Sequence, residues 1–363
     1  MWSVVVRATV VYHPDLLALD FGEGHPLRSD RYSNFLSLFS KLGLDKDVRF
    51  QTVGCQPATP EDLLLAHTPE YLSEVARVAQ AHGSLSIDTP VDPAVVRGSM
   101  LAVGGALEAG HLVVDGGKRH VVSFGGFHHA GPDYGAGFCV FNDVAVLARA
   151  LVKRHGRTRV MVLDTDAHAG DGTEDILAAD PNVLVVSIHQ DPTTLFPGKG
   201  FPHEIGVGEG KGFTVNVPLP IDAGLDEYQR CFQEIVNPLA REFKPEVLIR
   251  NGGSDPHYAD ELTHLGLSVG DFKWLGTMVR EAAGGAPIID MYGSGYNPNV
   301  LPYCWMALMS GTTGVNIAIP KIDEGRRREL AITPGLATQK DFEILGTIAE
   351  VKRNLKPYWK CFQ

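Results

Sequence analysis

Seven short runs of apolar, mostly β-branched residues constrain the fold of this chain more than any other feature. Continuous Val, Ile and Leu runs without polar alternation are typical of strands that are buried on both faces, as in a parallel sheet. The runs are Val4–Val11, His120–Ser123, Arg159–Leu163, Val183–Ile188, Thr214–Val217, Glu246–Ile249 and Pro287–Met291.

Helical patterns lie between these runs, at Asp30–Leu42, Glu61–Ala81, Val95–Val114, Val140–His155, Glu227–Phe243 and Val269–Ala283. Strand, loop and helix recur in that order, which predicts an α/β fold with a mainly parallel central sheet and helices on both faces. No low-complexity linker, charge block or repeat divides the chain, so we expect a single domain over residues 1–363.

The charge balance and the cysteines exclude several classes of protein. The chain has 32 basic and 43 acidic side chains, a net charge of -11, which argues against non-specific nucleic-acid binding. Its five cysteines contain no C-x-x-C pair, which argues against a disulfide framework or a thiolate zinc site. No apolar stretch reaches the roughly 18 residues of a membrane span. We therefore expect a cytoplasmic protein with no membrane partner.

Glycine is enriched in the loops that follow the predicted strands. The chain has 40 glycines in 363 residues, about 11% against a usual share of about 7%. Four glycine-containing loops follow strands, at Phe124–Phe138, Asp164–Thr173, Asn251–Leu265 and Tyr292–Asn297. Ligands of open α/β sheets bind at the carboxyl ends of the strands, so these loops are the expected site.

The sharpest motif is Asp164-x-Asp166-x-His168-x-x-Asp171, directly after an apolar strand. Alternate residues of an extended segment share a face, so Asp166 and His168 can point toward one ion. A carboxylate and imidazole set suits zinc, and iron, cobalt or manganese would also fit. Aspartate is also an ordinary helix N-cap, but four ionisable groups in eight positions are hard to explain as caps alone. The segment predicts a metal site.

Two other loops offer acid–base and ligand groups. His128 and His129 are neighbours, and imidazole titrates near neutral pH. Taken alone, the pair favours a structural role in a turn. The acid–base interpretation gains support because Asp164 and Asp171 could orient the two rings. Asp255 could complete a site with two carboxylates and one histidine, although an aspartate before proline is also common in turns.

The fourth loop places Tyr296 on a glycine hinge. A phenol there can donate a hydrogen bond to an oxyanion. A buried tyrosine with a satisfied hydroxyl is the alternative that this motif alone favours.

With these loops in place, the sequence resembles the zinc-dependent histone deacetylase superfamily, in particular its bacterial class I-like deacetylases, acetoin-utilisation proteins and acetylpolyamine amidohydrolases. The resemblance covers nearly the whole chain. Besides the loops above, it includes Gly24-His25-Pro26-Leu27-x-x-x-Arg31, Ala66-His67-Thr68-x-x-Tyr71 and Ser187-Ile188-His189-Gln190. It implies the arginase/deacetylase-like fold, with the active site at the carboxyl ends of the strands.

The resemblance also implies roles for individual residues. A zinc ion, or Fe²⁺ or Co²⁺ in its place, would be held by Asp166, His168 and Asp255. The implied catalytic residues are His128, His129, Asp164, Asp171 and Tyr296, with Asp164 paired to His128 and Asp171 to His129. The implied substrate-binding residues are Asp88, Gly137, Phe138 and Phe196. A structural potassium ion would be bound by Asp164 and Ser187 with the backbone of Asp166 and His168.

The implied reaction is hydrolysis of an acylated lysine side chain by metal-activated water, which releases acetate and a free amine. An acetylated polyamine or a small acylated metabolite is the alternative substrate. A binuclear manganese ureohydrolase is less favoured, because Asp255 is followed by Pro256 and His257 rather than by a second Asp-x-Asp ligand set. An inactive acyl-lysine binder is also less favoured, because the tyrosine and both histidines are retained.

Three features depart from the family pattern, one of them the atypical run Asn251-Gly252-Gly253-Ser254 before Asp255. Ala169 stands where a second histidine often follows the metal ligand, and Ser294 stands where class I members usually carry glycine. These departures leave the acyl-chain preference open.

Overall fold

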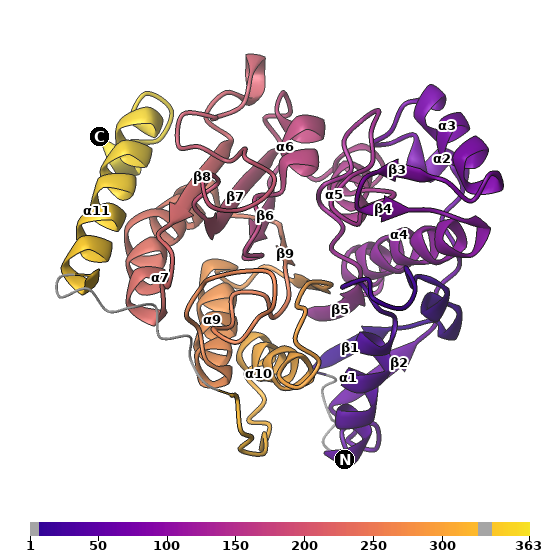
Figure 1. Cartoon of the computed structure of the whole chain (residues 1–363). Coiled ribbons are helices and arrows are strands. Elements are labelled where there is room, and N and C mark those ends of the chain that lie inside the picture. The colour runs from indigo at the N-terminus through magenta and orange to yellow at the C-terminus, as the bar shows by residue number, and fades with distance from the viewer. Residues whose placement is uncertain (1–6, 326–335) are drawn as a thin grey trace.

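A sheet of eight parallel strands forms the centre of the molecule (Figure 1). The computed structural model describes residues 7–325 and 336–363, without the side chains of 336–338. The strand order is β2-β1-β5-β10-β9-β6-β7-β8. The strands are β1 (Ala8–Val11), β2 (Phe50–Val53), β5 (His120–Phe124), β6 (Val160–Asp164), β7 (Val183–Gln190), β8 (Thr214–Leu219), β9 (Val247–Asn251) and β10 (Ile288–Tyr292). The predicted parallel α/β fold is confirmed.

Helices cover both faces of this sheet, as expected for apolar strands that are buried on two sides. On one face α4 packs on β5, α5 on β6 and α6 on β7, while on the other α10 packs between α1 and α9. The helices are α1 (Asp30–Lys41), α2 (Pro60–Leu63), α3 (Pro69–Gln80), α4 (Pro93–Val114), α5 (Asp143–Lys153), α6 (Asp171–Leu177), α7 (Leu225–Cys231), α8 (Asn237–Phe243), α9 (Val269–Ala282), α10 (Leu301–Thr313) and α11 (Leu336–Leu355).

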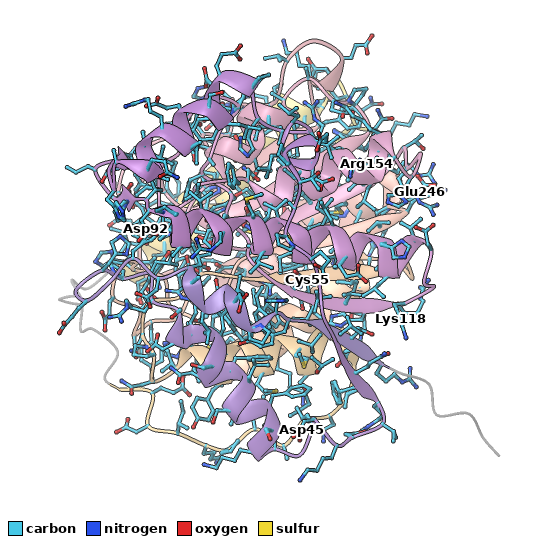
Figure 2. All side chains as sticks on the ribbon, turned by 90° about the vertical axis from the view of Figure 1, so that its right-hand side faces the viewer. Asp45, Cys55, Asp92, Lys118, Arg154 and Glu246 are labelled. Carbon is cyan, nitrogen blue, oxygen red and sulfur yellow. The ribbon has the colours of Figure 1, made fainter. Side chains whose placement is uncertain are left out.

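The longest helix, α4, shows how local sequence fixes an element. Asp92 caps it by accepting hydrogen bonds from the backbone N–H groups of Ala94 and Val95, and Pro93 occupies the first turn, where its missing N–H costs nothing. Figure 2 shows α4 lying across the near face, with Asp92 close to one end and Cys55 just below the helix.

Several predicted boundaries were wrong for physical reasons. The helix predicted over Glu61–Ala81 is divided into α2 and α3, because Pro69 starts a new helix that Thr68 caps through the N–H of Tyr71. The helix predicted from Val140 begins only at Asp143, since Asn142 is its N-cap. The helix predicted over Glu227–Phe243 is interrupted by a π-helical turn.

Several elements were missed, namely β2, β3 (Ser84–Ser86), β4 (Thr89–Pro90), α6, α10 and α11, and one element lies partly outside the described residues. β2 is a four-residue edge strand with two exposed positions, and α10 is apolar on all sides because it is buried, so neither has a clear periodicity. α11 was not predicted either. The first residues of the predicted Val4–Val11 strand are outside the described range, which holds β1 from Ala8.

The sheet order brings four loops to one edge. β5, β10, β9 and β6 are consecutive in the sheet although they are far apart in sequence. Because all four are parallel, the loops after Phe124, Tyr292, Asn251 and Asp164 leave from the same edge. Within the described residues, no helix is both long and apolar enough to cross a membrane.

Candidate metal and catalytic site

Asp166, His168 and Asp255 converge at the carboxyl edge of β6 and β9. One potential ligand atom from each lies within 4.8 Å of the other two, and all three residues are buried. His168 Nδ1 lies 3.0 Å from Asp166 Oδ1 and 3.2 Å from Asp255 Oδ2. Two carboxylates and an imidazole in this arrangement fit a divalent cation such as zinc.

Without a bound cation, the buried ionisable groups of Asp166, His168 and Asp255 shift one another's pKa values strongly. Burial and the neighbouring Asp166 charge raise the pKa of Asp255 to about 8. Burial opposes protonation of His168, but the two carboxylates outweigh it and raise the pKa of His168 to about 10. Carboxylates this close repel each other, and a bound cation would relieve that repulsion and keep His168 neutral.

Two buried His–Asp pairs lie beside the ligand set. His128 Nδ1 is 2.7 Å from Asp164 Oδ2, and His129 Nδ1 is 2.7 Å from Asp171 Oδ1. The two imidazole rings are 4.2 Å apart, centroid to centroid. Each aspartate occupies the Nδ1 side of its ring, which leaves both Nε2 atoms for chemistry.

The pKa values of the two histidines are shifted in opposite directions. Burial lowers the pKa of His128, but the charges of Asp164 and Asp166 outweigh it and raise the value to about 9. Burial and the nearby His128 charge lower the pKa of His129. The pair therefore combines one imidazole that holds a proton more readily with one that releases it more readily, as an acid–base pair requires.

Tyr296 lies on the same cavity wall as Ser294 and Gly293. Its backbone N–H donates to Asp260 Oδ2 at 2.8 Å, and the Arg31 guanidinium lies 5.4 Å from its ring centroid. Burial raises the pKa of the Tyr296 phenol well above its ordinary value, so the hydroxyl remains a hydrogen-bond donor at neutral pH.

A cavity of about 250 Å³ opens above these groups. Apolar side chains form much of its wall, namely Leu27, Phe127, Phe138, Leu195, Phe196 and Leu262. Phe138 packs edge-on to the Tyr296 ring at 5.8 Å, and Phe196 packs edge-on to the His129 ring at 5.0 Å. Phe196 is 44% exposed, which places it at the opening of the cavity.

Asp88 and Gly137 lie together in the same cavity wall. Asp88 Oδ1 accepts hydrogen bonds from Gly137 N at 3.2 Å and from Ser86 Oγ at 2.5 Å. Gly137 has a φ of +57°, and a Cβ there would lie 2.5 Å from Cδ2 of His129. Glycine is therefore required at this position both by the backbone and by the space beside the imidazole.

Asp164 and Ser187, which are expected to bind potassium, lie on β6 and β7. The two residues are aligned on these neighbouring strands. Asp164 Oδ1 accepts the N–H of Asp166, and Ser187 Oγ lies 2.8 Å from His189 Nδ1.

Sequence reasoning assigned no role to several residues that support the site. Asn251 Nδ2 donates to Asp164 Oδ2 at 3.1 Å, and its place at the carboxyl end of β9 was an available signal. Arg31 donates to the carbonyl oxygen of Gly293 at 2.5 Å, and no local signal connects residues 262 positions apart. Asp143 accepts from the N–H groups of Gly126 and Phe127 and so shapes the His128 loop.

The chain is similar to several known proteins. A family model described as the histone deacetylase domain matches residues 25–312. The chain is 32% identical to a probable deacetylase of Archaeoglobus fulgidus, over 98% of this chain and 99% of the relative. It is 34% identical to a histone deacetylase-like amidohydrolase of Pseudomonas aeruginosa (82% and 79% covered) and 34% identical to the acetoin utilization protein AcuC of Staphylococcus aureus (82% and 80%). The solved HD domain of HDA15 shares the fold, with a TM-score of 0.83 at 23% identity over 98% of this chain and 97% of that one.

Proposed function

Because the chain belongs to the histone deacetylase family and is therefore a hydrolase of amide bonds, we propose that it removes an acetyl or other short acyl group from acylated lysine side chains with the help of a zinc ion. The observation that carries the proposal is a convergence in one cavity. The Asp166–His168–Asp255 set, both His–Asp pairs and Tyr296 meet there, under an apolar wall. We further propose that residues 1–363 form one catalytic domain.

Asp166, His168 and Asp255 would hold the zinc ion, whose chemistry when bound is to polarise the amide carbonyl and to make water nucleophilic at neutral pH. Fe²⁺ or Co²⁺ would suit the same donor set.

His129 is the proposed general base. Its lowered pKa keeps it neutral, and Asp171 fixes the proton on Nδ1, so Nε2 can accept a proton from the attacking water. Water oxygen then bonds to the amide carbon, and the Tyr296 hydroxyl donates to the oxyanion that develops on the former carbonyl oxygen.

Collapse of this species breaks the carbon–nitrogen bond. The leaving nitrogen must gain a proton, and a protonated histidine of the 128–129 pair donates it, which yields acetate and a free amine. Asp164 and Asp171 act as positioning residues, because each fixes the orientation and the tautomer of its histidine.

The walls of the cavity support an acyl-lysine as the substrate. Phe138 and Phe196 would flank the four-carbon stem of the lysine, and Asp88 would accept hydrogen bonds from the substrate backbone at the opening. Among the lining residues, Asp88 and the metal ligand Asp166 carry the carboxylates. A polyamine with further ammonium groups would therefore find only one carboxylate in the cavity wall that is not a proposed metal ligand, which makes it the second choice.

A rate comparison with the zinc-loaded protein tests the proposal. The panel would hold acetyl-lysine peptides, acetylspermidine, and peptides with longer acyl chains, and metal content would be measured on the same preparation. We expect one zinc per active site and the highest kcat/KM on acetyl-lysine peptides. Faster turnover of acetylspermidine would identify a polyamine deacetylase instead.

Two other outcomes would overturn the assignment. Two essential manganese ions per chain would indicate a ureohydrolase, and a zinc-loaded protein without turnover on any acylated amine would indicate a binder.

We also propose that Asp164 and Ser187, with the backbone of Asp166 and His168, bind a structural potassium ion. Activity in potassium and in tetramethylammonium buffers of equal ionic strength tests this.

A further inference from the structure

Ser294 contacts a proposed metal ligand from the wall of the cavity. Its hydroxyl donates to Oδ1 of Asp255 at 2.6 Å. The other carboxylate oxygen, Oδ2, accepts the backbone N–H of Ala167 at 3.1 Å and lies 3.2 Å from His168 Nδ1. Oδ1 of Asp255 therefore accepts the hydrogen bond of the serine, while Oδ2 lies beside His168 in the ligand set.

The hydroxyl is held in place by the backbone around it. The carbonyl oxygen of Ser294 accepts hydrogen bonds from Ser254 N at 3.0 Å and from the indole N–H of Trp305 at 3.3 Å. The preceding carbonyl, of Gly293, accepts from buried Arg31. A serine with a fixed backbone and 8% exposure can hold a carboxylate in one rotamer.

Losing the hydroxyl would leave Asp255 without this restraint. The side chain is fully buried, so Oδ1 would lose its donor in a place where unpaired polar atoms are costly. The carboxylate could then rotate toward other donors and turn Oδ2 away from the ligand position.

We propose that Ser294 is a positioning residue that holds Asp255 in its ligating orientation and thereby sets the metal affinity of the site. The inference rests on the proposed function, since it assumes that Asp166, His168 and Asp255 bind the metal. Tyr296 follows Ser294 by two residues, so the same segment fixes both the ligand and the proposed oxyanion donor.

The test compares the zinc affinity of the wild type, Ser294→Ala and Ser254→Ala by competition with a chromophoric chelator. Ser254 is a matched control, because it is a buried serine of the Asp255 loop whose Oγ has no hydrogen-bond partner among the described residues. Partners of ligating groups contribute about 10- to 100-fold to metal affinity. We expect a loss of that size in Ser294→Ala and less than a twofold change in Ser254→Ala.

Two further measurements separate positioning from folding. The melting temperature of the metal-free Ser294→Ala protein should stay close to that of the wild type, and the visible spectrum of its Co²⁺ form should change. If Ser294→Ala does not fold, Ser294→Cys, which replaces the hydroxyl by a weaker donor of similar shape, should show a smaller loss in the same direction.

The outcomes are distinguishable from a failure of the proposed function. A wild-type protein that binds no zinc at this site would refute the proposed function itself. A wild type that binds zinc, together with a Ser294→Ala variant of equal affinity and unchanged Co²⁺ spectrum, would refute the role of Ser294 alone.

Discussion

Arg250 and Asp290 form an ion pair in the interior of the sheet. Arg250 Nε donates to Asp290 Oδ1 at 2.6 Å between the neighbouring strands β9 and β10, and both side chains are 0% exposed. Tyr292 and Thr312 donate to the second oxygen of Asp290 at 2.9 and 3.1 Å. Because Thr312 lies on α10, the pair also attaches that helix to β9 and β10, which precede the loops of Asp255 and Tyr296.

Replacing Asp290 by asparagine should destabilise the fold. Removing one partner of a buried ion pair costs about 3–5 kcal/mol, because the other charge remains buried without compensation. Urea unfolding followed by circular dichroism would measure this loss, with the exposed pair of Arg77 and Glu74 as the control. Glu74→Gln should give no measurable change, and equal midpoints for both variants would contradict the argument.

The same pair predicts a pH dependence of stability. Burial raises the pKa of Asp290, but Arg250 and His120 together outweigh burial and lower the value from 3.8 to about 2. A carboxylate whose pKa is lowered in the folded state stabilises the fold at pH values above its pKa in the unfolded state. This contribution is lost as the pH falls from about 4 toward 2. The slope of unfolding free energy against pH in that window should be smaller in Asp290→Asn than in the wild type.

Gly137→Ala should impair turnover more than it impairs folding. The new Cβ would lie 2.5 Å from Cδ2 of His129 and would displace the proposed base, and misplacement of about 1 Å can cost about 100-fold in rate. Gly43→Ala is the matched control, since Gly43 also has a positive φ, of +72°, with no atom within 4 Å of a Cβ. Steady-state kinetics should show a fall in kcat for Gly137→Ala and none for Gly43→Ala.

Tyr296→Phe should lower kcat by about 100- to 1,000-fold, the usual effect of removing one oxyanion donor. The phenol is not among the three proposed ligands, so zinc content should remain at the wild-type level. Tyr303→Phe serves as the control, because Tyr303 lies on α10 and is absent from the cavity wall. Unchanged turnover in Tyr296→Phe would remove the tyrosine from the mechanism.

The two histidines predict a bell-shaped pH profile. His129 must be neutral to act as base, and since its pKa is lowered, kcat/KM should fall only below the ordinary value of 6.5. His128 has a pKa raised to about 9, and a cation on Asp166 would reduce that shift. The alkaline limb should therefore lie between 6.5 and about 9.

His129→Ala should lose most activity while retaining zinc, and full activity in that variant would refute the assignment of the base.

Seven of the eight strands of the sheet and the positions of the site loops could be predicted from the sequence, whereas the supporting contacts could not. The apolar composition of runs such as Val160–Asp164 indicates strands that are buried on both faces. The polar residues that follow these runs indicate the carboxyl edge of the sheet. β2 and α10 lack periodicity, because one is a short edge strand and the other is surrounded by protein.

Ser294 illustrates the same limit within the site. Its identity was visible as a departure from the family pattern, but its hydrogen bond to Asp255 depends on β9 and β10 lying side by side. Contacts between residues of different strands cannot be predicted from the pattern of residues along one segment.

The position of β10 has a consequence for how the molecule folds. This strand comes last in the sequence among the strands of the sheet, yet it lies between β5 and β9 near the centre. Without it, β2-β1-β5 and β9-β6-β7-β8 would remain two separate half-sheets, with the 128–129 histidines on one and the Asp166–His168–Asp255 set on the other. Pairings of such long sequence separation are slow to form. During synthesis the catalytic groups come together only after residue 292 is available, so a ribosome-bound chain of the first 280 residues should carry no active site.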